Sequence, residues 1–183
     1  MLLRPSALST WLATLVVLTA VVVAPISMAH AQGAARGPSG LPLPRFVSLK
    51  AQKVNLRVGP GLDYAISWRY MRSGIPMEII QEYDNWRRVR DAEGTEGWIN
   101  QSLLSGERTA VAAPWMKDAG PETYVMLHSE PDERARLIAK LQPGVIVNIE
   151  GCNGTWCEID VDGAHGWLAQ QEIWGAYPGE AFR

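Results

Sequence analysis

The stretch that decides the fold is Trp86-Arg87-Arg88-Val89-Arg90-Asp91-Ala92-Glu93-Gly94-Thr95-Glu96-Gly97-Trp98-Ile99. It contains two short runs with aromatic and β-branched residues on either side of a polar, Gly-containing turn, which is typical of two neighbouring strands. Similar runs occur at 53–57 and 77–80, and Gly, Pro, Asn and Asp separate them. No stretch from Phe46 onward carries a sustained apolar period of 3.6 residues. The pattern predicts an all-β fold, either a small sandwich or a barrel.

The same pattern recurs about 70 residues later in the chain. Trp86 followed by Val89 matches Trp156 followed by Ile159, and the two copies end in Gly97-Trp98-Ile99 and Gly166-Trp167-Leu168. The two tryptophans of a copy are 12 residues apart in the first copy and 11 in the second. A period this long, with a complete set of strands in each copy, indicates two tandem domains rather than a solenoid.

Composition narrows the class of protein. The 183 residues are 47% hydrophobic, so the chain can bury a core. Its formal charge is −2, and nucleic-acid binding proteins carry a basic surface instead. We therefore expect no nucleic-acid partner.

The N-terminus is typical of an export signal. An apolar run spans Trp11 to Val23, and the small residues of Ala29-His30-Ala31 suit a cleavage site. An uncleaved membrane anchor is the alternative, although the run is short for a full span. We expect contact with the membrane only during export, unless the signal stays uncleaved. Residues after it are rich in Gly, Ala, Pro and Ser, as in a flexible, disordered linker.

A family resemblance rests on a few of these residues. Asn55-Leu56-Arg57-Val58-Gly59-Pro60, then Tyr64, then the Trp after a polar turn and the Gly97-Trp98 pair resemble the bacterial SH3-like domain (Src-homology-3, SH3b type). The second copy departs from the pattern, because His128 replaces the Arg and the Gly-Pro is reduced to Glu130-Pro131. The expected organisation is 1–31 signal peptide, 32–45 linker, 46–110 first SH3-like barrel, 111–121 inter-domain linker, 122–178 second barrel and 179–183 tail.

The resemblance implies a fold and a function. Each copy is expected to be a five-stranded barrel with a long first loop, about 59–70 in the first copy. The family binds peptides, often the peptide part of peptidoglycan, and is not catalytic. Tandem copies behind a signal peptide are similar to exported bacterial proteins that contain only these domains. A periplasmic or extracellular location, with a cell-wall peptide or an envelope protein as partner, is therefore expected.

Five residues are candidates for ligand binding. Asn55, Arg57 and Tyr64 flank the long first loop, and amide and phenol groups both donate and accept hydrogen bonds. The alternative is that Asn55 and Arg57 hold the loop in place, which we favour for Arg57. Trp86 and Trp156 lie an odd number of positions from a core residue, so each should face outward as a platform for a ligand. Alternatively, each lies flat over the edge of its barrel and only stabilises it.

Charge differs between the copies. Residues 46–113 carry nine basic and eight acidic side chains, whereas residues 118–183 carry four and eleven. The copies should therefore not share one ligand preference.

The two cysteines flank a hairpin turn, Cys152-Asn153-Gly154-Thr155-Trp156-Cys157. In an oxidising compartment a disulfide is expected. A zinc site of Cys152, Cys157, His128 and His165 is an alternative, but it lacks paired-ligand spacing such as Cys-x-x-Cys.

Three functions remain open from the sequence. The first is a non-catalytic, peptide-binding module of the cell envelope, with no cofactor and no metal. The second is a structural partner that docks onto another envelope protein or wall enzyme. The third is a small hydrolase that uses Cys157 with His165, which conflicts with the disulfide and lacks a helix N-terminus to lower the pKa of the thiol.

Overall fold

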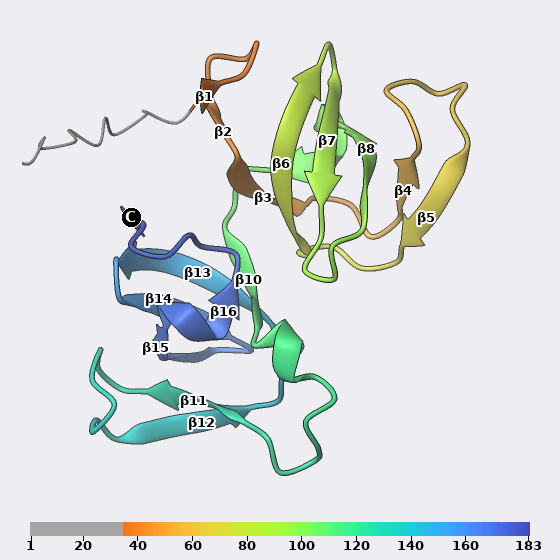
Figure 1. Cartoon of the computed structure of the whole chain (residues 1–183). Helices are drawn as coiled ribbons and strands as arrows, with labels where there is room; N and C mark the ends of the chain where they lie inside the picture. The colour runs from red at the N-terminus through yellow and green to blue at the C-terminus, as the bar shows by residue number, and fades with distance from the viewer. Residues whose placement is uncertain (1–34) are drawn as a thin grey trace, which may run out of the picture. The chain divides into compact units, whose positions relative to one another are not determined.

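The computed structural model describes residues 35–183 (Figure 1). The predicted signal peptide, residues 1–31, lies outside these residues, so the prediction of export remains one from sequence. Across the described range, no helix has both the length and the apolar character needed to span a bilayer. The described chain is all-β, as predicted, and its only helical segments are three 3₁₀ turns of three residues each.

The first repeat forms a seven-stranded antiparallel sheet in the order β5-β4-β8-β7-β6-β3-β9. The long hairpin of β6 and β7 dominates this sheet in Figure 1. The elements are β3 (Arg45–Leu49), β4 (Val54–Arg57), β5 (Ile66–Tyr70), β6 (Pro76–Tyr83), β7 (Trp86–Arg90), β8 (Glu96–Asn100), the 3₁₀ turn η1 (Gln101–Leu103) and β9 (Leu104–Ser105).

The second repeat follows the same order with its own strands, β12-β11-β15-β14-β13-β10-β16, and β17 adds to β13. The elements are β10 (Thr109–Ala112), the 3₁₀ turn η2 (Pro114–Met116), β11 (Val125–His128), β12 (Leu137–Leu141), β13 (Ile146–Asn153), β14 (Trp156–Val161), β15 (Ala164–Ala169), the 3₁₀ turn η3 (Gln170–Glu172), β16 (Ile173–Trp174) and β17 (Ala181–Phe182). Strand β10 takes the place that β3 has in the first sheet. It therefore pairs within the second repeat. Its residues, however, span the end of the expected first barrel (46–110) and the start of the expected linker (111–121).

In both repeats the order of hydrogen-bonded strands is linear and does not close on itself. This differs from the closed five-stranded barrel that the resemblance implies. In the described chain, β5 and β9 end the first order and do not pair with each other. The reason is local: η1 turns the chain after β8, so that the two-residue strand β9 pairs with β3 instead. The turn η3 and strand β16 do the same against β10 in the second repeat.

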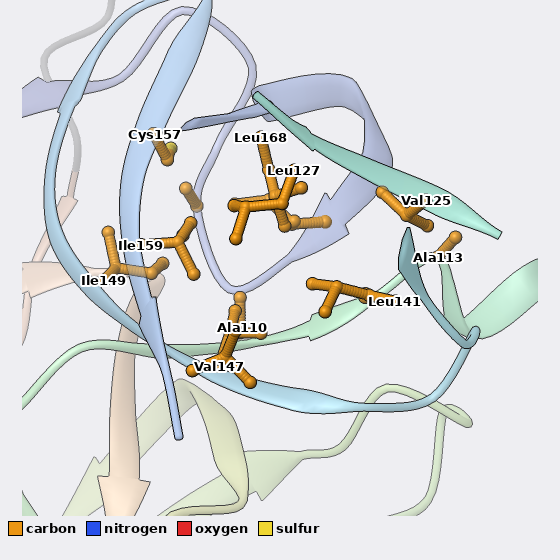
Figure 2. Packing of buried hydrophobic residues seen from close by; sticks show 14 of the residues in the cluster. Ala110, Ala113, Val125, Leu127, Leu141, Val147, Ile149, Cys157, Ile159 and Leu168 are labelled. Carbon is orange, nitrogen blue, oxygen red and sulfur yellow. The ribbon is translucent and has the colours of Figure 1, made fainter. Parts of the chain in front are cut away.

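Each repeat has its own hydrophobic core. In the first, fully buried Leu56, Met77, Val89 and Ile99 come from four different strands. In the second, the side chains of Ala110, Leu127, Val147, Ile159 and Leu168 point toward one another from five strands (Figure 2). Alternation along β4 and β14 leaves every second side chain out of the core, and Asn55, Arg57 and Trp156 are among those side chains.

A short arm precedes the first sheet, in the range expected as linker. Strands β1 (Ala35–Arg36) and β2 (Pro42–Leu43) pair as a hairpin. The arm is held by Glu82 of β6, whose carboxylate accepts hydrogen bonds from the backbone N–H and the hydroxyl of Ser39. The same carboxylate pairs with Arg45 at 2.7 Å and Arg87 at 3.3 Å.

Candidate functional site

Three of the predicted site residues line one shallow pocket in the first repeat. Asn55 and Arg57 project from β4, and Trp86 begins β7. This cavity has a volume of about 160 Å³. We call it the first-repeat pocket, and its lining residues are Lys53, Asn55, Arg57, Leu62, Trp86, Asn100 and Leu103.

Arg57 holds the first loop while it lines the pocket. Its Nη1 donates hydrogen bonds to the carbonyl oxygens of Leu62 at 2.9 Å and Tyr64 at 2.6 Å. These bonds close the loop over the end of β4 and keep the side chain of Leu62 at the pocket wall. The guanidinium thus acts as a loop brace, and its charge also lies at the pocket.

Tyr64 does not line the pocket. Its ring lies on the turn of Gly59 and Gly61, where a Cβ added at Gly61 would lie 3.2 Å from the ring. The glycines therefore make room for this ring. Tyr64 is exposed and remains a candidate ligand contact only by prediction.

Trp86 lies outside the core cluster of the first repeat. It is nevertheless buried, with a relative exposure of 9%. Val89, three residues on, is fully buried in the core, so the outward direction of Trp86 follows the alternation of the strand. Leu62 lines the same pocket as the indole. Little of Trp86 is free to meet a ligand, so the residue is mainly packed while it lines the pocket.

Four exposed apolar residues of the first loop and the edge strand β5 were not predicted from the sequence. We call them the exposed strip, which consists of Val58, Leu62, Ile66 and Trp68, and of these Leu62 lines the first-repeat pocket. Leu62 is 75% exposed and Trp68 is 56% exposed. The signal was present in the sequence, because Ile66-Ser67-Trp68 alternates, but alternation does not tell which face is buried.

The second repeat builds a related pocket around Trp156, at the start of β14. This cavity of about 400 Å³ is lined by Pro131, Asp132, Glu133, Arg134 and Trp156. We call it the second-repeat pocket. Trp156 corresponds to Trp86, but it is half-buried instead of buried.

His128 takes over the position and the bracing contact of Arg57. Its Nδ1 lies 3.2 Å from the carbonyl oxygen of Ala135, which corresponds to Tyr64 in the register of the two repeats. Because a carbonyl oxygen only accepts, Nδ1 carries the proton. The ring also stands edge-on to Trp156, with 5.8 Å between ring centroids.

In each repeat, one glycine lets the strand that carries the bracing residue, Arg57 or His128, come close to the neighbouring strand. Arg57 pairs with Trp98, and His128 pairs with Trp167. A Cβ at Gly97 would lie 2.9 Å from the carbonyl oxygen of Arg57, and one at Gly166 would lie 2.6 Å from that of His128. Only glycine permits this approach of β8 to β4 and of β15 to β11, so the glycine before each Trp is structural.

The cysteines form a disulfide across the β13–β14 hairpin. Cys152 and Cys157 are paired in register, and the amide oxygen of Asn153 accepts hydrogen bonds from the N–H groups of Thr155 and Trp156 in the turn. The bond holds the segment that carries Trp156. It also leaves no free thiol for the zinc site or for the Cys157–His165 pair considered from the sequence.

One cluster could offer ligands to a metal. The donor atoms of Glu150, Asp160 and His165 lie within 4.8 Å of one another, on β13, β14 and β15. His165 already faces a carboxylate with each nitrogen, Nδ1 at 3.5 Å from Glu150 and Nε2 at 3.4 Å from Asp160. A metal at this cluster would have to displace one of these contacts.

A family model described as "Bacterial SH3 domain" matches residues 50–106 and again residues 122–175. Among curated proteins, the chain is similar to the "Putative N-acetylmuramoyl-L-alanine amidase YrvJ" of Bacillus subtilis (strain 168), with 23% identity over 128 residues. That match covers 68% of this chain and 24% of the relative. The chain thus spans about a quarter of the length of this curated relative.

Solved structures of NlpC/P60-type proteins are also similar. NlpC2 and NlpC1 of Trichomonas vaginalis match with 15% and 14% identity and TM-scores of 0.31 and 0.32. These matches cover 72% and 75% of this chain and 48% of each solved chain. An NlpC/P60 family protein from Bacillus cereus ATCC 10987 matches with 8% identity and a TM-score of 0.30, over 70% of this chain and 55% of that chain.

Proposed function

Because the chain belongs to the bacterial SH3 domain family and carries two tandem copies of that domain, we propose that it is an exported, non-catalytic protein of the cell envelope that binds the peptide part of peptidoglycan. The observation that supports this most directly is the first-repeat pocket. It gathers Asn55, Arg57 and Trp86 at one place.

The chemistry of this pocket suits a short peptide. The amide oxygen of Asn55 accepts a hydrogen bond from Nε of Arg69 at 2.9 Å, which leaves the amide NH₂ group to donate to a peptide carbonyl. Leu62 and the exposed part of Trp86 offer apolar area, and Lys53 and Arg57 add positive charge that a peptide carboxylate can meet. Such a shallow site fits weak binding, in the micromolar to millimolar range.

Two further observations support the cellular context. The curated relative carries the name of an N-acetylmuramoyl-L-alanine amidase and is much longer than this chain, which leaves room there for more than SH3-type domains. The Cys152–Cys157 disulfide is of the kind that persists in oxidising compartments outside the cytoplasm.

Co-sedimentation with purified sacculi tests this function. We expect the protein to pellet with sacculi and Leu62→Asp to reduce the bound fraction severalfold, because the new carboxylate lies at the pocket wall. Met71→Asp is the matched control: Met71 is also an exposed apolar residue, it does not line the pocket, and its substitution should leave binding unchanged. The proposal fails if sacculi leave the protein in the supernatant, or if both variants bind as the parent does.

A second candidate function is docking onto another envelope protein. The exposed strip of Val58, Leu62, Ile66 and Trp68 favours it, because β5 is an edge strand with unpaired backbone groups that could accept a partner strand. Crosslinking in cells discriminates the two functions. One stoichiometric protein partner that is lost in Trp68→Ser, without attached glycan, would favour docking.

A further inference from the structure

The walls of the two pockets differ in charge at corresponding positions. In the first repeat, Leu62 and Leu103 are apolar walls. The strand registers place Glu133 at the position of Leu62 and Glu172 at that of Leu103. The second repeat therefore replaces two apolar side chains with carboxylates.

Three carboxylates of the second repeat, those of Asp132, Glu133 and Glu172, form no ion pair within residues 35–183. Asp132 and Glu133 line the second-repeat pocket. Glu172 is not one of its lining residues, but it lies at the register position of Leu103, and His128 and Glu133 both influence its pKa. Among residues 35–183, none of these three carboxylates takes part in an ion pair, and Arg134 is the one cation that lines the pocket. The pocket thus carries negative charge in excess.

The pKa of Glu172 is consistent with this excess. Burial raises the pKa of Glu172, His128 opposes that effect and Glu133 adds to it. A half-buried carboxyl beside another carboxylate gains most when a cation is brought to it.

Trp156 adds a surface that cations favour. The face of an indole attracts an ammonium group within about 6 Å of the ring centroid. Trp156 is more exposed than Trp86, and the residue of its loop that corresponds to Leu62 is Glu133. An aromatic face with carboxylates around it is a recurrent arrangement for binding a primary amine.

We propose that the second-repeat pocket binds the primary ammonium group of a peptide, between Trp156 and the carboxylates of Glu133 and Glu172. The first-repeat pocket has Lys53 and Arg57 at its wall and no carboxylate, so the two repeats of one chain select opposite charges. This inference rests on the proposed function, because it names the chemical group of a peptide that the second domain binds.

The test uses the whole chain and two probe peptides, N-acetyl-Ala-Ala-Lys-amide and the same peptide with an acetylated lysine side chain. Binding is followed by NMR through the indole N–H signal of Trp156, assigned with Trp156→Phe. We expect the free amine to bind at least tenfold more tightly than the acetylated peptide, with affinity that falls as NaCl is raised.

Variants locate the site. We expect Glu133→Gln to weaken binding of the free amine severalfold and Glu133→Gln with Glu172→Gln to weaken it tenfold or more. The matched control is Glu130→Gln, which removes an exposed carboxylate from the same loop but not from the pocket wall, and it should change affinity less than twofold. Since Glu133 is exposed, its substitution should leave the fold intact even if the double variant does not fold.

The outcomes separate this inference from the proposed function. The inference is overturned if the protein binds the two peptides equally. It is also overturned if both Glu133→Gln and the double variant bind the free amine as the parent does. If the protein still pellets with sacculi in that case, the proposed function stands without it. If the free amine binds at Trp156 while sacculi do not, the inference stands and the proposed function falls.

Discussion

Glu82 offers the sharpest test of the energetics of this fold. Its side chain is 1% exposed and lies between Ser39, Arg45 and Arg87. Burial by itself would raise the pKa of Glu82, but the hydrogen bonds from Ser39 and Arg45 and the charge of Arg45 outweigh it and lower the pKa to about 2. The folded state therefore holds this carboxyl ionised.

The magnitude follows from that pKa. A lowering from 4.5 to about 2, at about 1.36 kcal/mol per pKa unit, corresponds to about 3 kcal/mol. Because the folded pKa lies below the unfolded one, this stabilisation is fully present above pH 4.5 and is lost as the pH falls toward 2. Glu82→Gln removes the charge and leaves Arg87, whose side chain is almost buried, without its ion pair. We expect the variant to be about 3 kcal/mol less stable at pH 7 and nearly equal to the parent near pH 2.

Urea unfolding at pH 7, 4 and 2.5, followed by Trp fluorescence, measures this difference for the transition of the first repeat. Glu96→Gln is the control, since the Glu96–Arg88 ion pair is much more exposed and should contribute less than about 1 kcal/mol. The reasoning is refuted if Glu82→Gln matches the parent at pH 7, or if the loss of stability is the same at every pH.

Three further predictions concern the second repeat. Cys152→Ser with Cys157→Ser should lower the free energy of unfolding by about 2 kcal/mol, because the disulfide closes only a short loop. Urea unfolding under non-reducing conditions measures this loss, and an unchanged midpoint would contradict the prediction. Gly166→Ala should destabilise the repeat by about 1–3 kcal/mol and shift the NMR signals of Trp167, since the alanine Cβ would lie 2.6 Å from the carbonyl oxygen of His128. Unchanged stability and spectra would argue against the close approach of β15 to β11. Leu127→Ala should cost about 2–5 kcal/mol, whereas Met126→Ala, on the outer side of the same strand, should cost less than about 1 kcal/mol; equal losses in thermal or urea unfolding would refute the assigned faces of β11.

Local sequence patterns were enough to predict the class of fold, the repeat and the disulfide. The recurrence of Trp86 and Val89 as Trp156 and Ile159 identified two copies of one unit, and the family match now shows those copies. The bracing contacts of Arg57 follow its position beside the first loop, as favoured from the sequence. Within each copy these features depend on neighbours within about a dozen residues, where spacing in the chain and distance in space go together, and the repeat follows from the recurrence of the same spacings.

The candidate site was predicted less completely. Asn55, Arg57 and Trp86 share a pocket, whereas Tyr64 lies on the loop beside it and Leu103 was not foreseen as a wall. Leu103 reaches the pocket only because η1 turns the chain after β8. The exposure of Trp68 likewise depends on β5 being an edge strand, which no local pattern states.

The sequence by itself determined that residues alternate in strands, that the unit occurs twice, and that a Gly-Trp pair and a central Trp mark each copy, because these follow from residue spacing along a single strand or hairpin. Tertiary structure alone decided that β10 pairs within the second repeat, that Glu82 meets Arg45 and the arm, and that Glu172 stands where the first repeat has Leu103. The physical reason is that these contacts join segments distant in the chain. Their formation depends on how loops close and strands pair, which residue periodicity does not encode.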